Sequence, residues 1–546
     1  MSQSLKLKRR GFLRLSGLGV ATLFAGPLSG CAPTEQAEHA EQAIAITTAT
    51  TADLDIALQA MQGEVSILPG RATRVWTYQG QVNKGDPASL QTLPGSYLGP
   101  ILRVRKGQRV RIAFTNNLPE QSIVHWHGLH VPDDMDGHPR HAIGPGQTYV
   151  YEFQVLNRAG TYWFHPHPHG LTGPQVYKGL AGLFIISDDE ERAAGLPSGE
   201  YDIPLIIQDR TFSASNQLRY VLDGMTQMMG FLGDRVLVNG QPDFVLPVAT
   251  RPYRLRLLNG SNSRIYKLGW EDGTPLTVIA TDGGLLETPV QRRYVTLAPA
   301  ERVELWADFG GRSMGSELRL QSLAFAGAEA GGMGMMMGRS PAIADGSEFT
   351  VLRVRIASES DAKQALPERL STISRHRLED AVNRERPRAF TLAMQGMLWT
   401  INGRTFEMEN VAEDEVVALN TTEVWEFINQ PGRMGGGMMR GMSGEMAHPM
   451  HIHGPQFQVI ERNVRPEMRA KWETVSAGYV DEGWKDTVLL MPGERVRLLL
   501  RFEDFTGLYL YHCHNLEHED QGLMRNYRIT APSTASAFRA PFLDSV

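Results

Sequence analysis

Hydrophobic and polar residues alternate with a period of two in many short stretches of the chain. In "ILRVRKGQRVRIAFTNNL" (residues 101–118), apolar residues such as Leu102, Val104, Ile112 and Phe114 are flanked mostly by charged or polar ones. This alternation places the apolar side chains on one face of a β-strand. The Lys-Gly pair in the middle indicates a turn, so the stretch predicts a half-buried β-hairpin.

Comparable strand patterns recur twice, in residues 253–309 and again in residues 423–502. In each block a pair of predicted strands precedes a turn that contains asparagine: "FTNNL", "LLNGS" and "FINQP". Three weak repeats of a β unit predict an all-β protein built from three consecutive Greek-key β-sandwich domains.

The repeats also predict where the domains begin and end. Residues 32–61 lack strand alternation and are rich in Ala, Thr, Glu and Gln, so we expect a tether there. Charged, turn-rich stretches near 190–202 and 357–388 predict linkers, the second with a short helix. The predicted domains are 62–192, 200–357 and 388–530, followed by a tail at 531–546.

The first 31 residues have the pattern of an export signal. Arg9 and Arg10 precede an apolar stretch that ends near Phe24 and is too short to span a bilayer. This resembles a twin-arginine signal, which implies export to the periplasm. The stretch "LSGC" at 28–31 resembles a lipoprotein cleavage box with Cys31 as the lipidated residue, and simple cleavage nearby is the alternative.

Composition adds two constraints. The net charge of -6 is spread along the 546 residues, which excludes a typical nucleic-acid-binding protein and predicts no such partner. The chain has two cysteines, Cys31 and Cys513, which form either a disulfide or two unrelated thiols. We favour unrelated thiols, because each cysteine has a different explanation from its surroundings.

Histidine is concentrated in four short stretches: "HWHG" (125–128), "HPHPHG" (165–170), "HPMHIHG" (448–454) and "HCHNLEH" (512–518). Residues i and i+2 of a strand project to the same face, so each H-x-H pair directs two imidazoles to one side. Imidazole suits Cu, Zn, Fe and Ni. Four such pairs predict a metal cluster between the first and last domains.

Cys513 lies between His512 and His514 and therefore points to the opposite face of the same strand. Together with His518 and the more distant His448 it completes a set of one Cys and two His. This set, with a weak axial ligand, is the arrangement of blue-copper electron-transfer sites. One strand would then connect a copper–thiolate site covalently to an imidazole cluster.

These four motifs make the chain resemble the multicopper oxidases over about residues 62 to 530. The resemblance implies three cupredoxin-like domains and four copper ions, one of type 1 and three in a trinuclear cluster. It implies His448, Cys513 and His518 as type 1 ligands, and His125 and His451 as type 2 ligands. It implies two sets of type 3 ligands: His127, His165 and His514 on one ion, and His167, His453 and His512 on the other.

The resemblance also implies the reaction, in which four one-electron oxidations of a substrate are coupled to reduction of O2 to two waters. Asp136 and Glu519 match acidic positions with proposed proton-donor roles, and solvated surface acids are the alternative interpretation. His130, His138, His141 and His169 are expected near the sites or on the surface, with a ligand role for His169 kept open.

The axial position of the type 1 site is ten residues after the cysteine, where the family often has Met. Here that residue is Leu523, and Met524 follows it. Neighbouring residues of an extended segment point to opposite sides, so Met524 does not simply replace Leu523. Loss of a thioether donor destabilises Cu(II) relative to Cu(I), which predicts a high type 1 potential.

Twelve of the 23 methionines lie in three clusters, at 225–229, 332–338 and 433–446. Glycines throughout 433–446 preclude a packed amphipathic helix there, and soft thioethers select Cu(I). Met446 matches a substrate-copper residue of the bacterial cuprous oxidases, but Gly444 stands where an acidic partner is expected, with Glu445 adjacent. The full set of substrate-copper candidates is Met438, Met439, Met442, Glu445 and Met446.

The sequence therefore predicts a cuprous oxidase in copper tolerance, with O2 and either Cu(I) or small aromatic reductants as partners. The alternatives are a laccase that oxidises phenols or aromatic amines and a cupredoxin-fold scaffold protein without metals. The intact ligand set argues against the scaffold. The oligomeric state is not indicated.

The lipoprotein-like box leads to a test in the producing bacterium. If Cys31 is lipidated, the mature protein should partition with membranes, because a lipoprotein anchor carries several acyl chains. Cys31→Ser should release the protein or change its processing, as measured by membrane fractionation. A soluble, unmodified wild-type protein in the periplasm would contradict the prediction.

Overall fold

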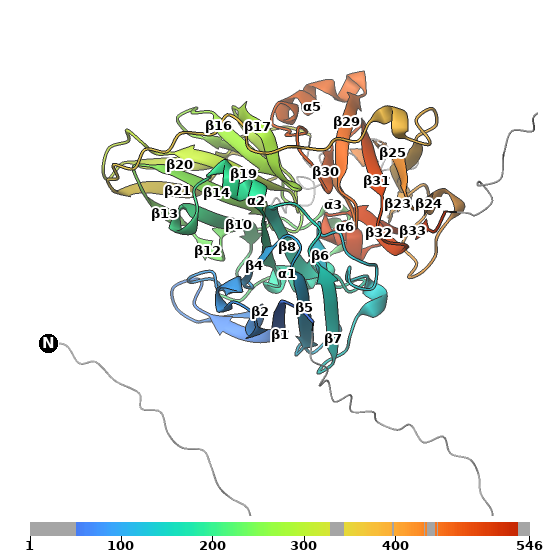
Figure 1. The fold of residues 1–546 in the computed structure, drawn as a ribbon, viewed down its shortest axis with the longest axis horizontal. Helices are drawn as coiled ribbons and strands as arrows, with labels where there is room; N and C mark the ends of the chain where they lie inside the picture. Colours follow the sequence, from blue (N-terminus) through green and yellow to red (C-terminus); the bar gives the residue numbers. More distant parts are fainter. Residues whose placement is uncertain are drawn as a thin grey trace, which may run out of the picture. The chain divides into compact units, whose positions relative to one another are not determined.

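The computed structural model describes residues 51–327, 343–395, 398–430, 432–433, 443–444 and 446–532 (Figure 1). All of these residues belong to one compact unit, Thr50–Val546. Cys31, Met438, Met439, Met442 and Glu445 lie outside the described residues.

Strands dominate the described residues, and six large sheets form three consecutive pairs, as the all-β prediction requires. The first pair combines the orders β2-β1-β5-β7 and β3-β4-β9-β8-β6. Its strands are β1 (Leu54–Val65), β2 (Thr73–Lys84), β3 (Leu90–Gln91), β4 (Ile101–Arg105), β5 (Arg109–Asn116), β6 (Val124–His127), β7 (Thr148–Gln154), β8 (Gly160–Pro166) and β9 (Gly182–Ser187).

The second pair, green to yellow in Figure 1, combines the orders β12-β11-β10-β14-β19-β16-β17 and β13-β21-β20-β15-β18. Its strands are β10 (Asp202–Arg210), β11 (Arg235–Val238), β12 (Gln241–Pro242), β13 (Val245–Ala249), β14 (Pro252–Asn259), β15 (Tyr266–Trp270), β16 (Leu276–Thr281), β17 (Gly284–Arg292), β18 (Val295–Leu297), β19 (Arg302–Asp308), β20 (Glu317–Ser322) and β21 (Phe349–Ser358).

The third pair, orange to red, combines the orders β23-β22-β25-β31-β29 and β24-β33-β32-β28-β30. Its strands are β22 (Arg388–Gln395), β23 (Leu398–Ile401), β24 (Val416–Ala418), β25 (Thr421–Asn429), β28 (His448–Ile452), β29 (Phe457–Val464), β30 (Thr487–Leu490), β31 (Glu494–Phe502), β32 (Gly507–Cys513) and β33 (Met524–Thr530).

Short elements complete the described structure. A separate two-stranded sheet pairs β26 (Gly432–Arg433) with β27 (Ser443–Gly444). The α-helices are α1 (Thr172–Lys178), α2 (Asp189–Ala194), α3 (Gly224–Met229), α5 (Arg469–Ser476) and α6 (Leu516–Asp520). The 3-10 helices are η1 (Pro87–Ser89), η2 (Pro139–His141), η3 (Gly199–Tyr201), η4 (Leu378–Asp380), η5 (Glu413–Glu415) and η6 (Pro466–Met468). None of the helices in these ranges has the length and apolar character needed to cross a bilayer.

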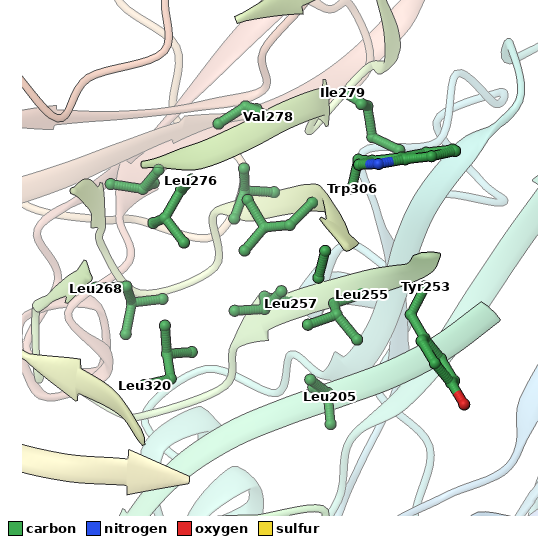
Figure 2. Close-up of a cluster of buried hydrophobic side chains, with 14 of the residues drawn as sticks. Leu205, Tyr253, Leu255, Leu257, Leu268, Leu276, Val278, Ile279, Trp306 and Leu320 are labelled. Atoms are coloured by element: carbon green, nitrogen blue, oxygen red, sulfur yellow. The ribbon is translucent and has the colours of Figure 1, made fainter. Parts of the chain in front are cut away.

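Each pair of sheets encloses its own hydrophobic core, so each is a β-sandwich. Figure 2 shows part of the core of the second pair, where Leu255 and Leu257 of β14 face Leu268 of β15 and Leu320 of β20. Both sheets of every pair also contain one parallel pairing, such as β1 with β5, β10 with β14, and β22 with β25. The three sandwiches therefore repeat one topology, as the sequence repeats predict.

Two expectations about the first sandwich are wrong. The predicted tether at 32–61 overlaps β1, where Leu54, Ile56, Leu58 and Ala60 alternate as buried residues and the strand pairs with both β2 and β5. Small and polar residues at the intervening positions weakened the apolar signal. The predicted hairpin at 101–118 is also absent, because β4 and β5 lie in different sheets and the Lys-Gly turn connects them across the sandwich.

Candidate metal centres

The four H-x-H motifs meet where a sheet of the first sandwich faces a sheet of the third. Within the first, β6 and β8 are neighbours and place His125 opposite His165. Within the third, β28 and β32 are neighbours and place His451 opposite His512. Each strand pair thus presents four imidazoles, and all eight are buried. Their rings contact one another across the boundary between the sandwiches, as in the stack of His125 on His453 (3.7 Å between centroids).

Backbone carbonyls fix the proton positions of several rings. The Nδ1 of His125 lies 2.6 Å from the carbonyl oxygen of Asp136, and the Nδ1 of His451 lies 2.8 Å from that of Asp486. A carbonyl only accepts, so each Nδ1 carries the hydrogen and each Nε2 exposes a lone pair. The two Nε2 atoms nevertheless lie 3.3 Å apart. Two lone pairs at this distance repel each other unless a cation lies between them, so this pair fits a metal ion.

Two further groups have the spacing of ligands around one ion. His165 Nε2 is 3.4 Å from both His127 Nδ1 and His514 Nε2. His512 Nε2 is 3.3 Å from His167 Nε2 and 3.1 Å from His453 Nε2. Two nitrogens bound at about 2.0–2.1 Å to one tetrahedral ion lie about 3.4 Å apart. The groups contain the same residues as the two predicted type 3 sets.

Burial keeps seven of these imidazoles neutral. Desolvation lowers the pKa of His514 to about 3 and that of His167 to about 4. It lowers the pKa of the following rings well below the usual value: His125, His127, His165, His451 and His453. A metal needs the neutral ring, so the site offers its lone pairs at neutral pH without first releasing protons.

Cys513 faces away from this cluster, as the strand alternation predicts. Its Sγ lies 3.4 Å from His448 Nδ1 and 3.7 Å from His518 Nδ1, and all three side chains are fully buried. Sulfur and nitrogen bound to one ion at about 2.3 and 2.0 Å lie about 3.5–3.7 Å apart at tetrahedral or trigonal angles. Burial raises the pKa of the Cys513 thiol, and coordination of a metal deprotonates such a thiol outright.

The carbonyl oxygen of Met228 in α3 closes the other side of this site. It accepts hydrogen bonds from His518 Nε2 (2.9 Å) and from the indole nitrogen of Trp399 (3.1 Å). The first bond places the hydrogen of His518 on Nε2 and leaves Nδ1 free to face Cys513. Sequence reasoning missed this contact, because a backbone carbonyl has no sequence signature.

Leu523 and Met524 occupy different cores. Leu523 is fully buried in the cluster that contains Cys513, whereas Met524 packs in a separate cluster with Phe406 and Leu510. This places Leu523 on the side of the Cys513 site and agrees with the register used in the sequence. Met450 lies opposite Cys513 in the β28–β32 pairing and belongs to the same cluster as Leu523.

The two predicted acidic residues are not surface groups. Asp136 is 0% exposed and Glu519 is 1% exposed, so the alternative of solvated surface acids is wrong. Asp136 Oδ2 lies 2.6 Å from His453 Nδ1, and Glu519 Oε2 lies 3.1 Å from His512 Nδ1. Burial, reinforced by the nearby Asp133, raises the pKa of Asp136 well above its ordinary value.

The remaining histidines lie outside the metal-binding groups found in the described residues. His138 is buried and contacts Asn526 (2.9 Å), and His130 lies 2.9 Å from Asp504. His169 is exposed against the ring of Phe406, so its ligand role is not supported. Sequence reasoning also missed Asp486, which contacts the cluster, and Arg302, which holds Asp486; both come from stretches without a recognisable motif.

The axial position gives a direct test of the Cys513 site. Leu523→Met should add a soft thioether donor, stabilise Cu(II) and lower the type 1 reduction potential. Met524→Leu is the matched control and should leave the potential nearly unchanged, because that side chain packs in another cluster. Redox titration of the thiolate-to-copper absorption measures both. If only Met524→Leu shifts the reduction potential, Met524 rather than Leu523 is the axial residue and the assigned register is wrong by one residue.

Comparisons with known proteins agree with this geometry. Two models of the multicopper oxidase family match residues 63–191 and 381–533. A multicopper oxidase of Staphylococcus haemolyticus is 34% identical over 80% of this chain and 83% of its own length. A laccase of Bacillus subtilis is 30% identical over 82% of this chain and 91% of its own length. The crystal structure of a multicopper oxidase from Aquifex aeolicus superposes with a TM-score of 0.71 and 35% identity over 88% of this chain and 97% of that one. The chain belongs to the multicopper oxidase family, whose cupredoxin-like domains and copper chemistry account for its three sandwiches and its buried Cys–His and His clusters.

Proposed function

We propose that the protein is an O2-reducing oxidase that holds four copper ions in the sites described above. His448, Cys513 and His518 form the type 1 site, His125 and His451 the type 2 site, and the other six imidazoles the type 3 pair. Copper in these sites would accept single electrons from a substrate and supply four of them to O2, which becomes two waters. The observation that carries the proposal is that Cys513 ends β32 and that its two chain neighbours, His512 and His514, both belong to the histidine cluster.

This placement gives electrons a short covalent route. The thiolate of Cys513 faces one site, and the residues bonded to it on either side contribute imidazoles to the other. Both ends of the route are fully buried, so water is kept away from it. A low-dielectric environment also reduces the reorganisation that accompanies each change of charge.

O2 reduction consumes protons, and two buried carboxylates lie against the cluster. Asp136 contacts Nδ1 of His453, the ring nitrogen turned away from the cluster, and Glu519 contacts Nδ1 of His512. We propose that both carboxylates orient these rings and deliver protons to the reaction. Their contacts with ligand imidazoles support the orienting role, and the raised pKa of buried Asp136 supports its role as a proton donor.

We further propose that Cu(I) is the physiological substrate. The β26–β27 pair closes the base of the Met-rich segment, and the chain then runs through Met446 to the type 1 ligand His448. Met446 is buried in the same hydrophobic cluster as Cys513. Thioether sulfurs prefer Cu(I), so a cuprous ion held near Met446 would lie beside the point where electrons enter.

The covering of the type 1 site also favours a small donor. None of its three side-chain ligands is exposed. His518 Nε2 is covered by the Met228 carbonyl oxygen, to which it donates a hydrogen bond. A phenol would need α3 to move before it could contact that ring. A laccase role remains the second candidate, because the Bacillus subtilis relative carries that name.

The twin-arginine signal and Cys31 lead us to propose a periplasmic, lipid-anchored protein. Export of a folded chain suits this architecture, because the cluster needs ligands from both the first and the third sandwich at once.

Steady-state O2 consumption separates the two substrate classes. The copper-loaded protein should consume O2 with a higher kcat/KM for Cu(I) than for 2,6-dimethoxyphenol under matched conditions. Measurements with an O2 electrode should include a Cu(I) control without protein, which corrects for spontaneous oxidation. A clear preference for the phenol would reverse the assignment in favour of a laccase.

The Met-rich segment provides a second test. Removal of residues 433–444, with Met446 and His448 retained, should raise the apparent KM for Cu(I) because thioethers that capture the ion are lost. Phenol oxidation should hold or increase, because sulfurs that suit Cu(I) do not bind a phenol. The thiolate-to-copper absorption must be retained for the comparison to be valid.

A matched variant separates the effect of the thioether sulfurs from the effect of the segment's size. In this variant Leu replaces four methionines together: Met434, Met438, Met439 and Met442. The substitutions keep the length and apolar character of the segment but remove its thioethers. This variant should reproduce the loss with Cu(I) but not the gain with phenol. Equal losses with both substrates would show that the segment supports the site generally.

A further inference from the structure

One ring of the histidine cluster is held differently from its neighbours. In four of the rings, Nδ1 faces a backbone carbonyl oxygen and Nε2 is turned toward the cluster: His125, His165, His451 and His512. His127 has the opposite arrangement. Its Nε2 lies 3.1 Å from Asp486 Oδ1, and its Nδ1 is the nitrogen that faces His165 Nε2 at 3.4 Å.

The carboxylate that faces His127 is itself held rigidly. Arg302 donates from both terminal nitrogens to Asp486, with 2.7 Å between Nη1 and Oδ1. The remaining donors of Arg302 reach backbone carbonyls of Thr161 (3.0 Å), Ala300 (3.0 Å) and Asp282 (3.1 Å). All five N–H groups of the guanidinium are therefore used, and both residues are buried.

These contacts connect all three sandwiches at one point. His127 ends β6 in the first, Arg302 begins β19 in the second, and Asp486 directly precedes β30 in the third. The second sandwich contributes no imidazole to the cluster. Its Arg302, however, holds Asp486, whose carboxylate contacts the cluster ring of His127. The carbonyl oxygen of Asp486 also accepts from His451 Nδ1 (2.8 Å), so one residue contacts two cluster rings.

The glycine of the HWHG motif provides an independent indication of how tightly this pair is packed. A Cβ on Gly128 would lie 2.3 Å from Asp486 Oδ2 and 2.9 Å from Arg302 Nη2. Gly128 also has a φ of +85°, which disfavours other residues. The missing side chain of Gly128 thus leaves room for the Asp486–Arg302 pair beside the His127 ring, which Asp486 contacts.

We propose that Asp486, held by Arg302, is the positioning residue that sets the tautomer and orientation of His127 and so makes Nδ1 its metal-binding nitrogen. The inference rests on the proposed copper cluster. Without the carboxylate, the hydrogen on Nε2 keeps only the Thr487 hydroxyl (3.2 Å) as an acceptor, and that hydroxyl is itself oriented by its bond to Asp486 Oδ1 (3.0 Å). The Nδ1 lone pair is then no longer firmly directed at the cluster. Loss of such an outer contact commonly lowers metal affinity about 10–100-fold.

Asp486→Asn tests the proposal with little change in volume. Oδ1 of Asp486 faces both His127 and Arg302 Nη1, and Oδ2 faces Arg302 Nη2, so in either orientation the NH2 group of the amide meets a second donor, from Arg302 or from His127. Copper retained after dialysis against increasing chelator should fall at about 10–100-fold lower chelator concentration for the histidine cluster. The thiolate-to-copper absorption of the Cys513 site should be unchanged, because that site lies on the other face of β32.

Asp209→Asn is the matched control. Asp209 forms a buried pair with Arg264 in the second sandwich (2.8 Å), so the substitution removes the same charge from the same kind of pair without touching an imidazole. It should lower the melting temperature but leave cluster copper in place. If Asp486→Asn fails to fold, Arg302→Lys replaces it, because Lys supplies three donors instead of five.

Equal copper retention in Asp486→Asn and Asp209→Asn would overturn the proposal. Parallel loss of cluster copper and of the thiolate absorption would also overturn it, because it would indicate general loosening of the fold. Copper retention is measured without turnover, whereas the proposed oxidase activity is tested by O2 uptake of the wild type. Failure of one claim is therefore distinguishable from failure of the other.

Discussion

Eight buried imidazoles directed at a common volume are the constraint on which this structure depends. Their nitrogens approach to between 3.1 and 3.4 Å, and in the His125–His451 pair both nitrogens carry lone pairs. Such an arrangement is unfavourable in an empty protein and becomes favourable when cations lie between the rings. Burial lowers the pKa of seven of these rings and keeps them neutral, so they are ready to bind metal, and a bound cation would relieve the repulsion between their lone pairs.

The fold meets this constraint with strand pairing. The β6–β8 and β28–β32 registers place histidines directly opposite each other, and the alternation of side chains along β32 separates Cys513 from His512 and His514. Buried acceptors then fix several of the rings: the carbonyls of Asp136 and Asp486 hold two of them, and the Asp486 carboxylate holds His127. The Met228 carbonyl holds His518 in the same way, which extends the principle to the Cys513 site.

Much of this arrangement could be predicted from the sequence, because it depends on local periodicity. The H-x-H spacing predicted which imidazoles share a face, and the position of Cys513 between two histidines predicted two sites on one strand. The all-β prediction succeeded for the same reason. The first strand was missed because Leu54, Ile56 and Leu58 are followed by Ala60, and the intervening residues resemble those of a tether.

What the sequence did not reveal depends on tertiary contacts. Asp486 and Arg302 are far apart in the chain and meet only because β19 and the residue before β30 converge near β6. The HWHG motif likewise does not indicate that a Cβ on Gly128 would collide with Asp486 Oδ2. The hairpin predicted at 101–118 failed because the sequence shows that strands exist but not which sheet each one joins.

The most direct measurement is the copper content of the purified, copper-loaded protein beside that of Cys513→Ser, with their visible absorption recorded on the same samples. We predict about four copper ions per wild-type chain and an intense thiolate-to-copper band, and about three ions and no such band in the variant. A variant that keeps the band, or a wild type that binds no copper at the histidine cluster, would contradict this prediction.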